Sequence, residues 1–214
     1  MRRKTIGSIS LAAIIATAPV AAFAATSSTG EYGQWGLDMS DQRNGALNGS
    51  YTYDATGAGV RVYVVDTGID AGHGDLGGRV VGGYNAVDGS GSTADCNGHG
   101  THMAGLVAGR GYGIAKGATL VPVRVQACDY TSSTQRYVAG IDWMVANHQA
   151  GTPAVANMSF DENPSAELDA AVQRAIDDGI TVVVAAGNAN EGHGSDNCAV
   201  SPARNANTVR VGGV

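Results

Sequence analysis

Five short, valine-rich apolar runs recur along this chain, and they constrain its fold more than any other feature. The first reads GVRVYVVD and ends at Asp66, and the later ones read ATLVPVRV, PAVANMS, ITVVVAAG and NTVRVGGV. Unbroken apolar runs of this length are typical of strands that are buried on both faces, as in a parallel sheet. The sequence therefore predicts a buried, mostly parallel sheet.

Two segments between these runs, residues 133–148 and 165–179, have helical periodicity. Their apolar residues recur every three or four positions: Val138, Ile141, Met144 and Val145 in the first, and Leu168, Val172 and Ile176 in the second. Ser165 suits the start of the second helix and Gly179 its end. Strands that alternate with helices predict an α/β fold with helices on both faces of the sheet.

The first 24 residues, MRRKTIGSISLAAIIATAPVAAFA, have a basic start, an apolar middle and small residues at their end. This pattern is typical of a secretory signal peptide, and Pro19 in a short apolar run argues against a membrane anchor. We expect an extracellular chain that begins near Ala25 and has no membrane association after cleavage. Without Arg2, Arg3 and Lys4 it carries 10 basic and 19 acidic side chains, which argues against nucleic-acid binding.

The chain has three cysteines, Cys96, Cys128 and Cys198. Thiols of exported proteins usually pair, so an odd number leaves one of them without a partner. The residues alone leave two explanations open. The third cysteine is a buried free thiol, or its partner lies in sequence beyond this chain.

Three polar residues lie where a parallel sheet carries its working groups, at the carboxyl ends of strands. Asp66 ends the first run, His99 opens the Gly/Ala-rich segment HGTHMAGLVAG, and Asn188 follows VVVAAG. Each has an ordinary explanation on its own, since Asp and Asn favour turns and a histidine can be satisfied in a core. Together they predict a catalytic site.

The segments VVDTGID, GHGTHMAG and VVVAAGN, in this order, resemble the subtilisin-like serine proteases. YGIAKGATLVPVRV, VANMS, SPARN and VRVGG are similar to the proteinase K-like branch of that family. The resemblance implies a three-layer subtilisin-like fold over residues 35–214, preceded by a signal peptide (1–24) and a short linker (25–34). It also implies a secreted, monomeric serine endopeptidase that acts on peptides or proteins and needs no cofactor for catalysis, with structural calcium as a possible addition.

The resemblance assigns a role to each of the three polar residues. Asp66 orients the imidazole of His99, which acts as the general base toward a serine hydroxyl. Asn188 donates its side-chain amide to the oxyanion of the tetrahedral intermediate. His102 is implied to pack beneath the base, and Cys96 is implied to form a disulfide with Cys128.

The resemblance also places two substrate-binding edges. The Ser-Leu-Gly-Gly of the family appears here as Ser159, Phe160, Asp161 and Glu162, and a Gly-rich edge appears at residues 129–132. Ala186 and Gly187 complete the predicted binding residues. Glycines allow a peptide backbone to lie close and pair as an added strand, so Asp161 and Glu162 are expected to crowd this approach or to favour basic substrate residues.

The nucleophile of the family lies in Gly-Thr-Ser-x-Ala, which this sequence does not contain; Val214 follows Asn188 by only 26 residues. Ser159 lies in the substrate edge, and Ser90, Ser92 and Ser195 lie in Gly-rich loops without the motif. We therefore expect a fold that is incomplete at the C-terminus, with an exposed apolar face and with Cys198 lacking its downstream partner. Two alternatives to the protease are a non-catalytic peptide-binding relative and a decayed gene fragment.

Three other chemistries fit the residues less well. A zinc site could use Cys96, His99 and His102, but the His-Glu-x-x-His pattern is absent. The Asp-Thr-Gly at Asp66 also marks aspartic proteases, which need two such loops, and the sequence has one. A dinucleotide site would need G-x-G-x-x-G directly after the first strand. The remaining histidines, His73, His148 and His193, are expected at the surface or in loops.

Overall fold

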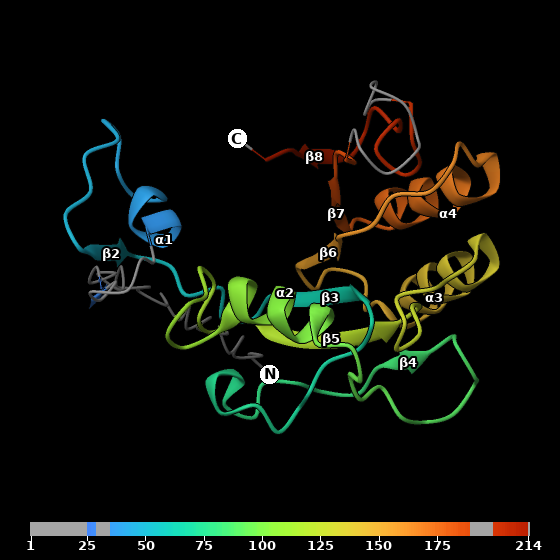
Figure 1. Ribbon diagram of the computed structural model, residues 1–214, viewed down its shortest axis with the longest axis horizontal. Coiled ribbons are helices and arrows are strands. Elements are labelled where there is room, and N and C mark those ends of the chain that lie inside the picture. Colours follow the sequence, from blue (N-terminus) through green and yellow to red (C-terminus); the bar gives the residue numbers. More distant parts are fainter. Residues whose placement is uncertain (1–24, 29–34, 189–198, 214) are drawn as a thin grey trace, which may run out of the picture.

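A six-stranded parallel sheet with the order β4-β5-β3-β6-β7-β8 forms the centre of the molecule (Figure 1). The computed structural model describes residues 25–28, 35–188 and 199–213. Its strands are β1 (Ala25–Ser28), β2 (Ser50–Tyr53), β3 (Arg61–Asp66), β4 (Tyr84–Asn85), β5 (Thr119–Arg124), β6 (Ala154–Met158), β7 (Thr181–Ala185) and β8 (Val209–Val211). Its helices are α1 (Trp35–Met39), the short 3-10 helix η1 (Gly74–Leu76), α2 (His99–Ala108), α3 (Thr134–Asn147) and α4 (Ala166–Asp177). The five predicted runs form β3, β5, β6, β7 and β8, and the α/β fold class is confirmed. The predicted burial holds for β3 and β5, but β8, at the edge of the sheet, is exposed along its whole length.

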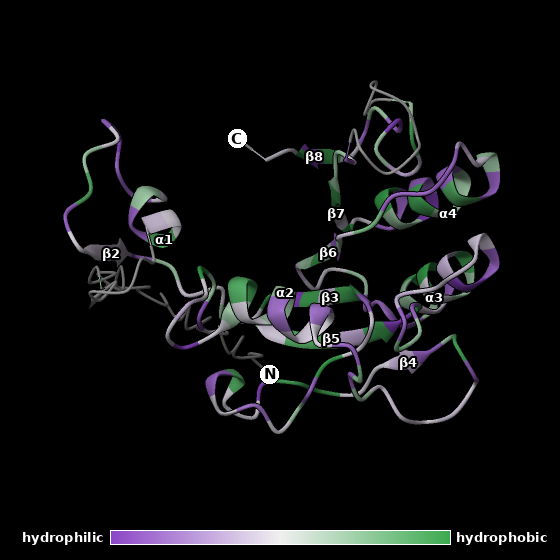
Figure 2. Cartoon of the chain, viewed as in Figure 1, coloured by the Kyte–Doolittle hydropathy of each residue, from purple (hydrophilic) through white to green (hydrophobic). Residues whose placement is uncertain are grey.

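The alternation of side chains along the strands divides the core into two layers. On one face, Tyr63 and Val65 of β3 pack with residues of α3 and α4, including Ile141 and Leu168. On the other face, Val62 and Val64 of β3 pack against α2. Figure 1 shows α3 and α4 side by side, with α2 crossing β3 and β5. Figure 2 shows largely hydrophobic strands beneath helices that combine hydrophobic and hydrophilic residues.

The α2 face of the sheet is less completely covered than the α3–α4 face. An open groove of about 380 Å³ follows α2 there, and its apolar lining includes Val62, Leu106, Ile114 and Val155. Leu106 is 48% exposed and Ile114 is 43% exposed. The described residues thus leave an apolar surface open on the side of the sheet that carries the site.

Residues 25–28, predicted to belong to a linker, form β1, which pairs antiparallel with β2 apart from the main sheet. Asp38 of α1 accepts hydrogen bonds from the amides of Asn48 (3.2 Å) and Gly49 (2.7 Å) and so fixes the loop that leads into β2. Within the described ranges, no helix is both long and apolar enough to cross a membrane.

Candidate active site

Asp66 and His99 meet where β3 ends and α2 begins. The side chain of Asp66 is fully buried, while that of His99 is 29% exposed. Gly100 makes this approach possible, because a Cβ at that position would clash with the carbonyl oxygen of Gly68 and crowd Asp66. The glycine after the histidine therefore allows the helix to begin directly against the carboxylate.

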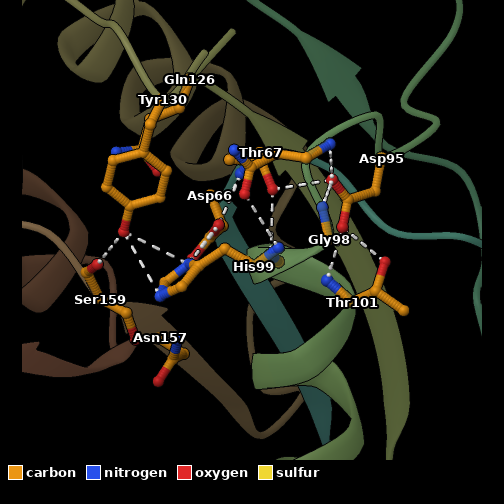
Figure 3. Close-up of polar contacts among 12 residues, drawn as sticks. Asp66, Thr67, Asp95, Gly98, His99, Thr101, Gln126, Tyr130, Asn157 and Ser159 are labelled. Carbon is orange, nitrogen blue, oxygen red and sulfur yellow. Dashed lines mark hydrogen bonds and ion pairs between the residues drawn. The ribbon is translucent and has the colours of Figure 1, made fainter. Parts of the chain in front are cut away.

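The two side chains form a hydrogen-bonded pair (Figure 3). Nδ1 of His99 lies 2.8 Å from Oδ1 and 2.9 Å from Oδ2 of Asp66, and the Thr67 amide donates to Oδ1 at 2.7 Å. Burial raises the pKa of Asp66, although the hydrogen bonds from His99 and Thr67 act in the opposite direction. A carboxylate at Nδ1 holds the proton there, so Nε2 is left as the accepting nitrogen of the neutral ring.

A second carboxylate, Asp95, ties the end of β3 to the start of α2. Its oxygens accept hydrogen bonds from the Thr67 hydroxyl (2.9 Å), from the amides of Asn97 (2.9 Å) and Gly98 (2.8 Å), and from the amide and hydroxyl of Thr101 (2.9 and 2.6 Å). Burial by itself would raise the pKa of Asp95, but these hydrogen bonds outweigh it and lower the pKa to about 2. A carboxylate at a helix N-terminus is also favoured by the helix dipole.

Asp95 and Thr67 act on the pair through the backbone. The Thr67 hydroxyl that donates to Asp95 accepts from the Gly100 amide at 2.9 Å, next to His99. Sequence analysis did not single out either residue. An aspartate shortly before a predicted helix start is a capping signal that could have identified Asp95, but no local signal shows that it also reaches Thr67.

Cys96 and Cys128 form a disulfide, with Cα atoms 5.1 Å apart. The bond joins the loop before α2 to the loop after β5, and Nη2 of Arg124 lies 3.2 Å from the sulfur of Cys96. This is the pairing that the resemblance implies. It occupies the thiol that a zinc site would need, whereas Cys198 lies outside the described residues.

Tyr130 lies in the loop after β5, within the substrate-binding edge predicted at residues 129–132, but its contact with His99 was not predicted. Its hydroxyl lies 3.3 Å from Nε2 of His99 and 3.4 Å from the carbonyl oxygen of Ser159 (Figure 3). The two rings meet edge to face, with centroids 5.1 Å apart and an interplanar angle of 84°. Tyr130 therefore connects the two predicted substrate-binding edges across the imidazole.

The predicted edge at residues 159–161 lies directly after β6. The Ser159 hydroxyl accepts from the Asn157 side chain at 2.9 Å. Phe160 is buried and stacks on Tyr137 with ring centroids 4.0 Å apart, so only its backbone is left to face a peptide. The apolar ring of Phe160 is part of the core, so Phe160 can bind a peptide only through its backbone N–H and C=O groups.

The other predicted binding residues follow β7. The Ala186 amide donates to Val211 of β8 at 2.8 Å. Gly187 has a φ of 91°, which a glycine adopts without strain. A Cβ on Gly187 would come within 3.4 Å of a carboxylate oxygen of Asp161, so Gly187 lies close to the predicted edge at residues 159–162. Asn188 is exposed at the end of this segment, and its oxyanion role stays a prediction.

Two histidines differ from expectation. His102 does not pack beneath His99 but is exposed on α2 and lines an open hollow of about 420 Å³ with His73 and Tyr112. Three residues along a helix differ by about 60° in direction, which turns His102 away from Asp66. His148 lies in the loop directly after α3, as predicted, but its side chain is only 3% exposed and pairs with Asp178. His193 lies outside the described residues.

A bound metal ion needs several donor side chains close together. Within residues 25–28, 35–188 and 199–213, no group of three or more His, Cys, Asp or Glu side chains is arranged to hold one. The calcium that the resemblance implies therefore has no acidic cluster to fit it in this part of the chain.

The chain is similar to known proteins over most of its length. The model of the Subtilase family matches residues 57–214. Over 178 residues, the chain is 53% identical to the extracellular serine proteinase of Thermus sp. (strain Rt41A) and 48% identical to alkaline serine exoprotease A of Vibrio alginolyticus. Both alignments cover 83% of this chain, which spans 42% and 32% of the two relatives' lengths.

A solved structure has the same fold. The crystal structure of a cold adapted subtilisin-like serine proteinase aligns with a TM-score of 0.78 and 45% sequence identity. The alignment covers 82% of this chain and 62% of that chain. The family match over most of the chain, the identities to the two serine proteinases and this shared fold lead to one conclusion: the chain belongs to the Subtilase family.

Proposed function

We propose that this chain provides the general base, its orienting acid and an oxyanion donor of a secreted serine endopeptidase. The observation that carries the proposal is the pair of Asp66 and His99, in which a fully buried carboxylate lies 2.8 Å from Nδ1 of an imidazole that is 29% exposed. Two relatives named as an extracellular serine proteinase and an alkaline serine exoprotease support it. The substrate is a peptide or protein, and catalysis needs no cofactor.

In the proposed reaction, Nε2 of His99 accepts the proton of a serine hydroxyl as the serine oxygen attacks the scissile carbonyl carbon. Asp66 keeps the proton on Nδ1 and stabilises the imidazolium that forms. Asn188 donates its amide to the oxygen that becomes negative in the tetrahedral intermediate. His99 then returns the proton to the leaving amine. Among the described residues, the His99 ring is hydrogen-bonded to Asp66 and Tyr130 and to no serine hydroxyl.

The remaining parts of the proposal concern the chain as a whole. Residues 1–24 act as a signal peptide, residues 25–34 as a short linker, and residues 35–214 belong to the peptidase domain, which works as a monomer. The apolar run and basic start of the first segment support export. Structural calcium remains compatible with the family but needs ligands other than an acidic cluster among the described residues.

A fluorophosphonate probe, which reacts with an activated serine, tests the proposal on the secreted product. We expect the complete secreted enzyme, which includes the nucleophilic serine, to be labelled, and its His99→Ala variant to remain unlabelled. His148→Ala serves as a matched control, because it removes a second histidine–aspartate pair, which lies before the amino ends of β6 and β7 rather than at the carboxyl end of β3, and it should be labelled like the wild type. A folded, secreted product that is never labelled would contradict the proposal and support a peptide-binding relative without catalysis.

A further inference from the structure

The loop after β5 holds Tyr130 in an unusual backbone conformation. Its φ is 69°, and among the described residues it is the one non-glycine residue with a positive φ. A side chain other than glycine is disfavoured there, and such conformations persist where surrounding contacts enforce them. The resemblance places a Gly-rich edge at this position, so a glycine would adopt the same turn without strain.

Contacts on both sides of Tyr130 fix this turn. The Tyr130 amide donates to the Ala127 carbonyl at 3.0 Å, and the Ala127 amide donates to the Thr131 carbonyl at 2.9 Å. The Asp129 carboxylate accepts from the Thr131 amide (3.1 Å) and hydroxyl (2.6 Å). The disulfide anchors Cys128 two residues before Tyr130. The loop therefore holds the side chain over the site rather than letting it rotate into solvent.

The two acceptor atoms near the Tyr130 hydroxyl are the atoms that the proposed reaction needs. Nε2 of His99 is the base nitrogen, and the Ser159 carbonyl belongs to the edge where an extended peptide would pair through its main chain. The distances of 3.3 and 3.4 Å are long for a hydroxyl donor, whose usual distance is about 2.8 Å. A peptide N–H can therefore displace the hydroxyl from Ser159 at little cost.

The Tyr130 ring is harder to displace than its hydroxyl. It lies edge to face with the imidazole at 5.1 Å, on a backbone that the turn and the disulfide fix. A peptide can pull the hydroxyl away from the Ser159 carbonyl, but the ring still occupies the space beside His99. The peptide side chain that faces this space has to be small.

We propose that Tyr130 is a specificity-determining residue, which narrows the subsite beside His99 so that peptides with glycine or alanine at the facing position bind in preference to peptides with leucine or phenylalanine. This inference rests on the proposed function, because it treats the cleft at His99 as the peptide site. The ring and the hydroxyl of Tyr130 have different effects in this inference. The ring sets the preference for small peptide side chains, and the hydroxyl competes with the peptide for the Ser159 carbonyl.

A positional peptide series tests the inference on the secreted protein. In four-residue fluorogenic peptides, each position in turn carries Gly, Ala, Leu or Phe, and kcat/KM is measured for wild type, Tyr130→Gly and Tyr130→Phe. For wild type we expect one position with at least a tenfold preference for Gly or Ala over Phe. Tyr130→Gly should reduce this preference to less than threefold. Tyr130→Phe should keep the preference, because it keeps the ring, and should raise kcat/KM for all peptides about two- to fivefold.

The controls separate this inference from folding and from the proposed function. Tyr130→Gly should fold, since glycine suits a φ of 69°, and its thermal unfolding checks this. Tyr112→Gly removes another exposed tyrosine, in the loop after α2, and should leave the preference unchanged. Binding of the uncleaved peptides is measured by calorimetry in parallel. If peptides bind with the Tyr130-dependent preference but are not cleaved, the inference holds while the proposed function fails.

Two results would overturn the inference. The first is a wild-type preference that persists unchanged in Tyr130→Gly. The second is a protein that cleaves or binds all peptides in the series equally well, or binds none of them in either form, since Tyr130 then selects nothing beside His99.

Discussion

Two histidine–aspartate pairs lie at opposite ends of the strands of the same sheet, and they differ in which of the two residues is buried. At the carboxyl edge, Asp66 is fully buried and His99 is 29% exposed, with 2.8 Å between Nδ1 and the carboxylate. At the amino edge, the His148 side chain is 3% exposed and Asp178 is 36% exposed, with 2.7 Å between Nδ1 and the carboxylate. The distance between Nδ1 and the carboxylate is nearly the same in the two pairs, but the histidine is the more exposed residue in the first pair and the aspartate in the second.

The second nitrogen of each ring shows what the reversal means. Nε2 of His148 lies 2.9 Å from the Thr152 carbonyl, so both of its nitrogens are used by the fold. Nε2 of His99 has only the long contact with the Tyr130 hydroxyl. The buried imidazole of His148 bonds to two partners and so stabilises the contact between the loops before β6 and β7. The exposed imidazole of His99, which rests on a buried acid, can exchange a proton with a substrate. Orientation and burial, rather than the pair itself, distinguish a site from a structural contact.

Removing each imidazole should give the largest difference between the pairs. We expect His99→Ala to lower kcat/KM for peptide hydrolysis by a factor of about 10⁴ to 10⁶, the size of effect seen when a triad histidine is lost. His148→Ala should leave kcat/KM within about threefold and lower the melting temperature instead, since a buried hydrogen-bonded group is lost. Peptide kinetics and thermal unfolding of both variants measure this. Equal losses of activity in the two variants would contradict the assignment of roles.

Changing the acids should give the next largest difference. Asp66→Asn keeps the size of the side chain but can hold the imidazole in the wrong tautomer, so we expect a loss of about 10⁴ in kcat. Asp178→Asn should change kcat little, because its partner does not face the cleft. The same assay measures both. Near-normal kcat in Asp66→Asn would show that this carboxylate does not orient the base.

Asp95 supports only the first pair, and its loss should have an intermediate effect. Asp95→Ala removes the acceptor of the Thr67, Gly98 and Thr101 hydrogen bonds. We expect it to destabilise the protein by about 1–3 kcal/mol and to lower kcat about 10- to 100-fold by loosening the His99 position.

The pH dependence of stability provides a second measurement at Asp95. Its pKa is lowered to about 2, so its stabilising contribution is present above the unfolded-state value near 4 and is lost as the pH falls toward 2. Wild type should therefore lose more stability than Asp95→Asn between pH 4.5 and 2, as measured by thermal unfolding. Asp142→Asn, at an exposed ion pair with Arg174, is the control and should resemble wild type. Parallel curves for wild type and Asp95→Asn would contradict this role.

The smallest effect is expected from the titration of His148. The hydrogen bond with the Thr152 carbonyl raises the pKa of His148, and the nearby Asp178 adds to this against the opposing effect of burial. A raised pKa means that the stabilisation is complete below the unfolded-state value near 6.5 and is lost as the pH rises through the folded-state pKa. The melting temperature of wild type should fall by no more than a few degrees over that range. His148→Asn should lack this fall, and a wild-type curve that rises instead would refute the assignment.

Much of the fold could be predicted because its signals are local. The valine-rich run at Asp66 is a buried strand, the run before Asn188 is a strand of alternating burial, and Ser165 caps α4 by accepting from the Leu168 amide. Short strands without a continuous apolar run gave no such signal. β4 is only Tyr84 and Asn85, and β1 pairs with a strand more than twenty residues away. Pairing partners at that separation cannot be read from periodicity.

In the candidate site, too, residues with local sequence signals were predicted and contacts between distant residues were not. Asp66 and His99 were identified from motifs that lie at a strand end and a helix start. Tyr130 was predicted only as part of the edge at residues 129–132; its contact with His99 was missed because the two residues are 31 positions apart. The burial of His148 depends on Asp178, 30 positions away. The side chains that modify the site are brought to it by the order of the strands.

By itself, the sequence determined the α/β fold class, the family resemblance and the identity of the histidine at the strand edge, because each depends on residues close together in the chain. Only the tertiary structure decided which histidine–aspartate pair has an exposed imidazole, that Asp95 joins the end of β3 to α2, and that Tyr130 contacts the imidazole. These features depend on burial and on distances between separate loops. Such distances are set when β3, β5 and β6 pack side by side and bring their carboxyl ends together.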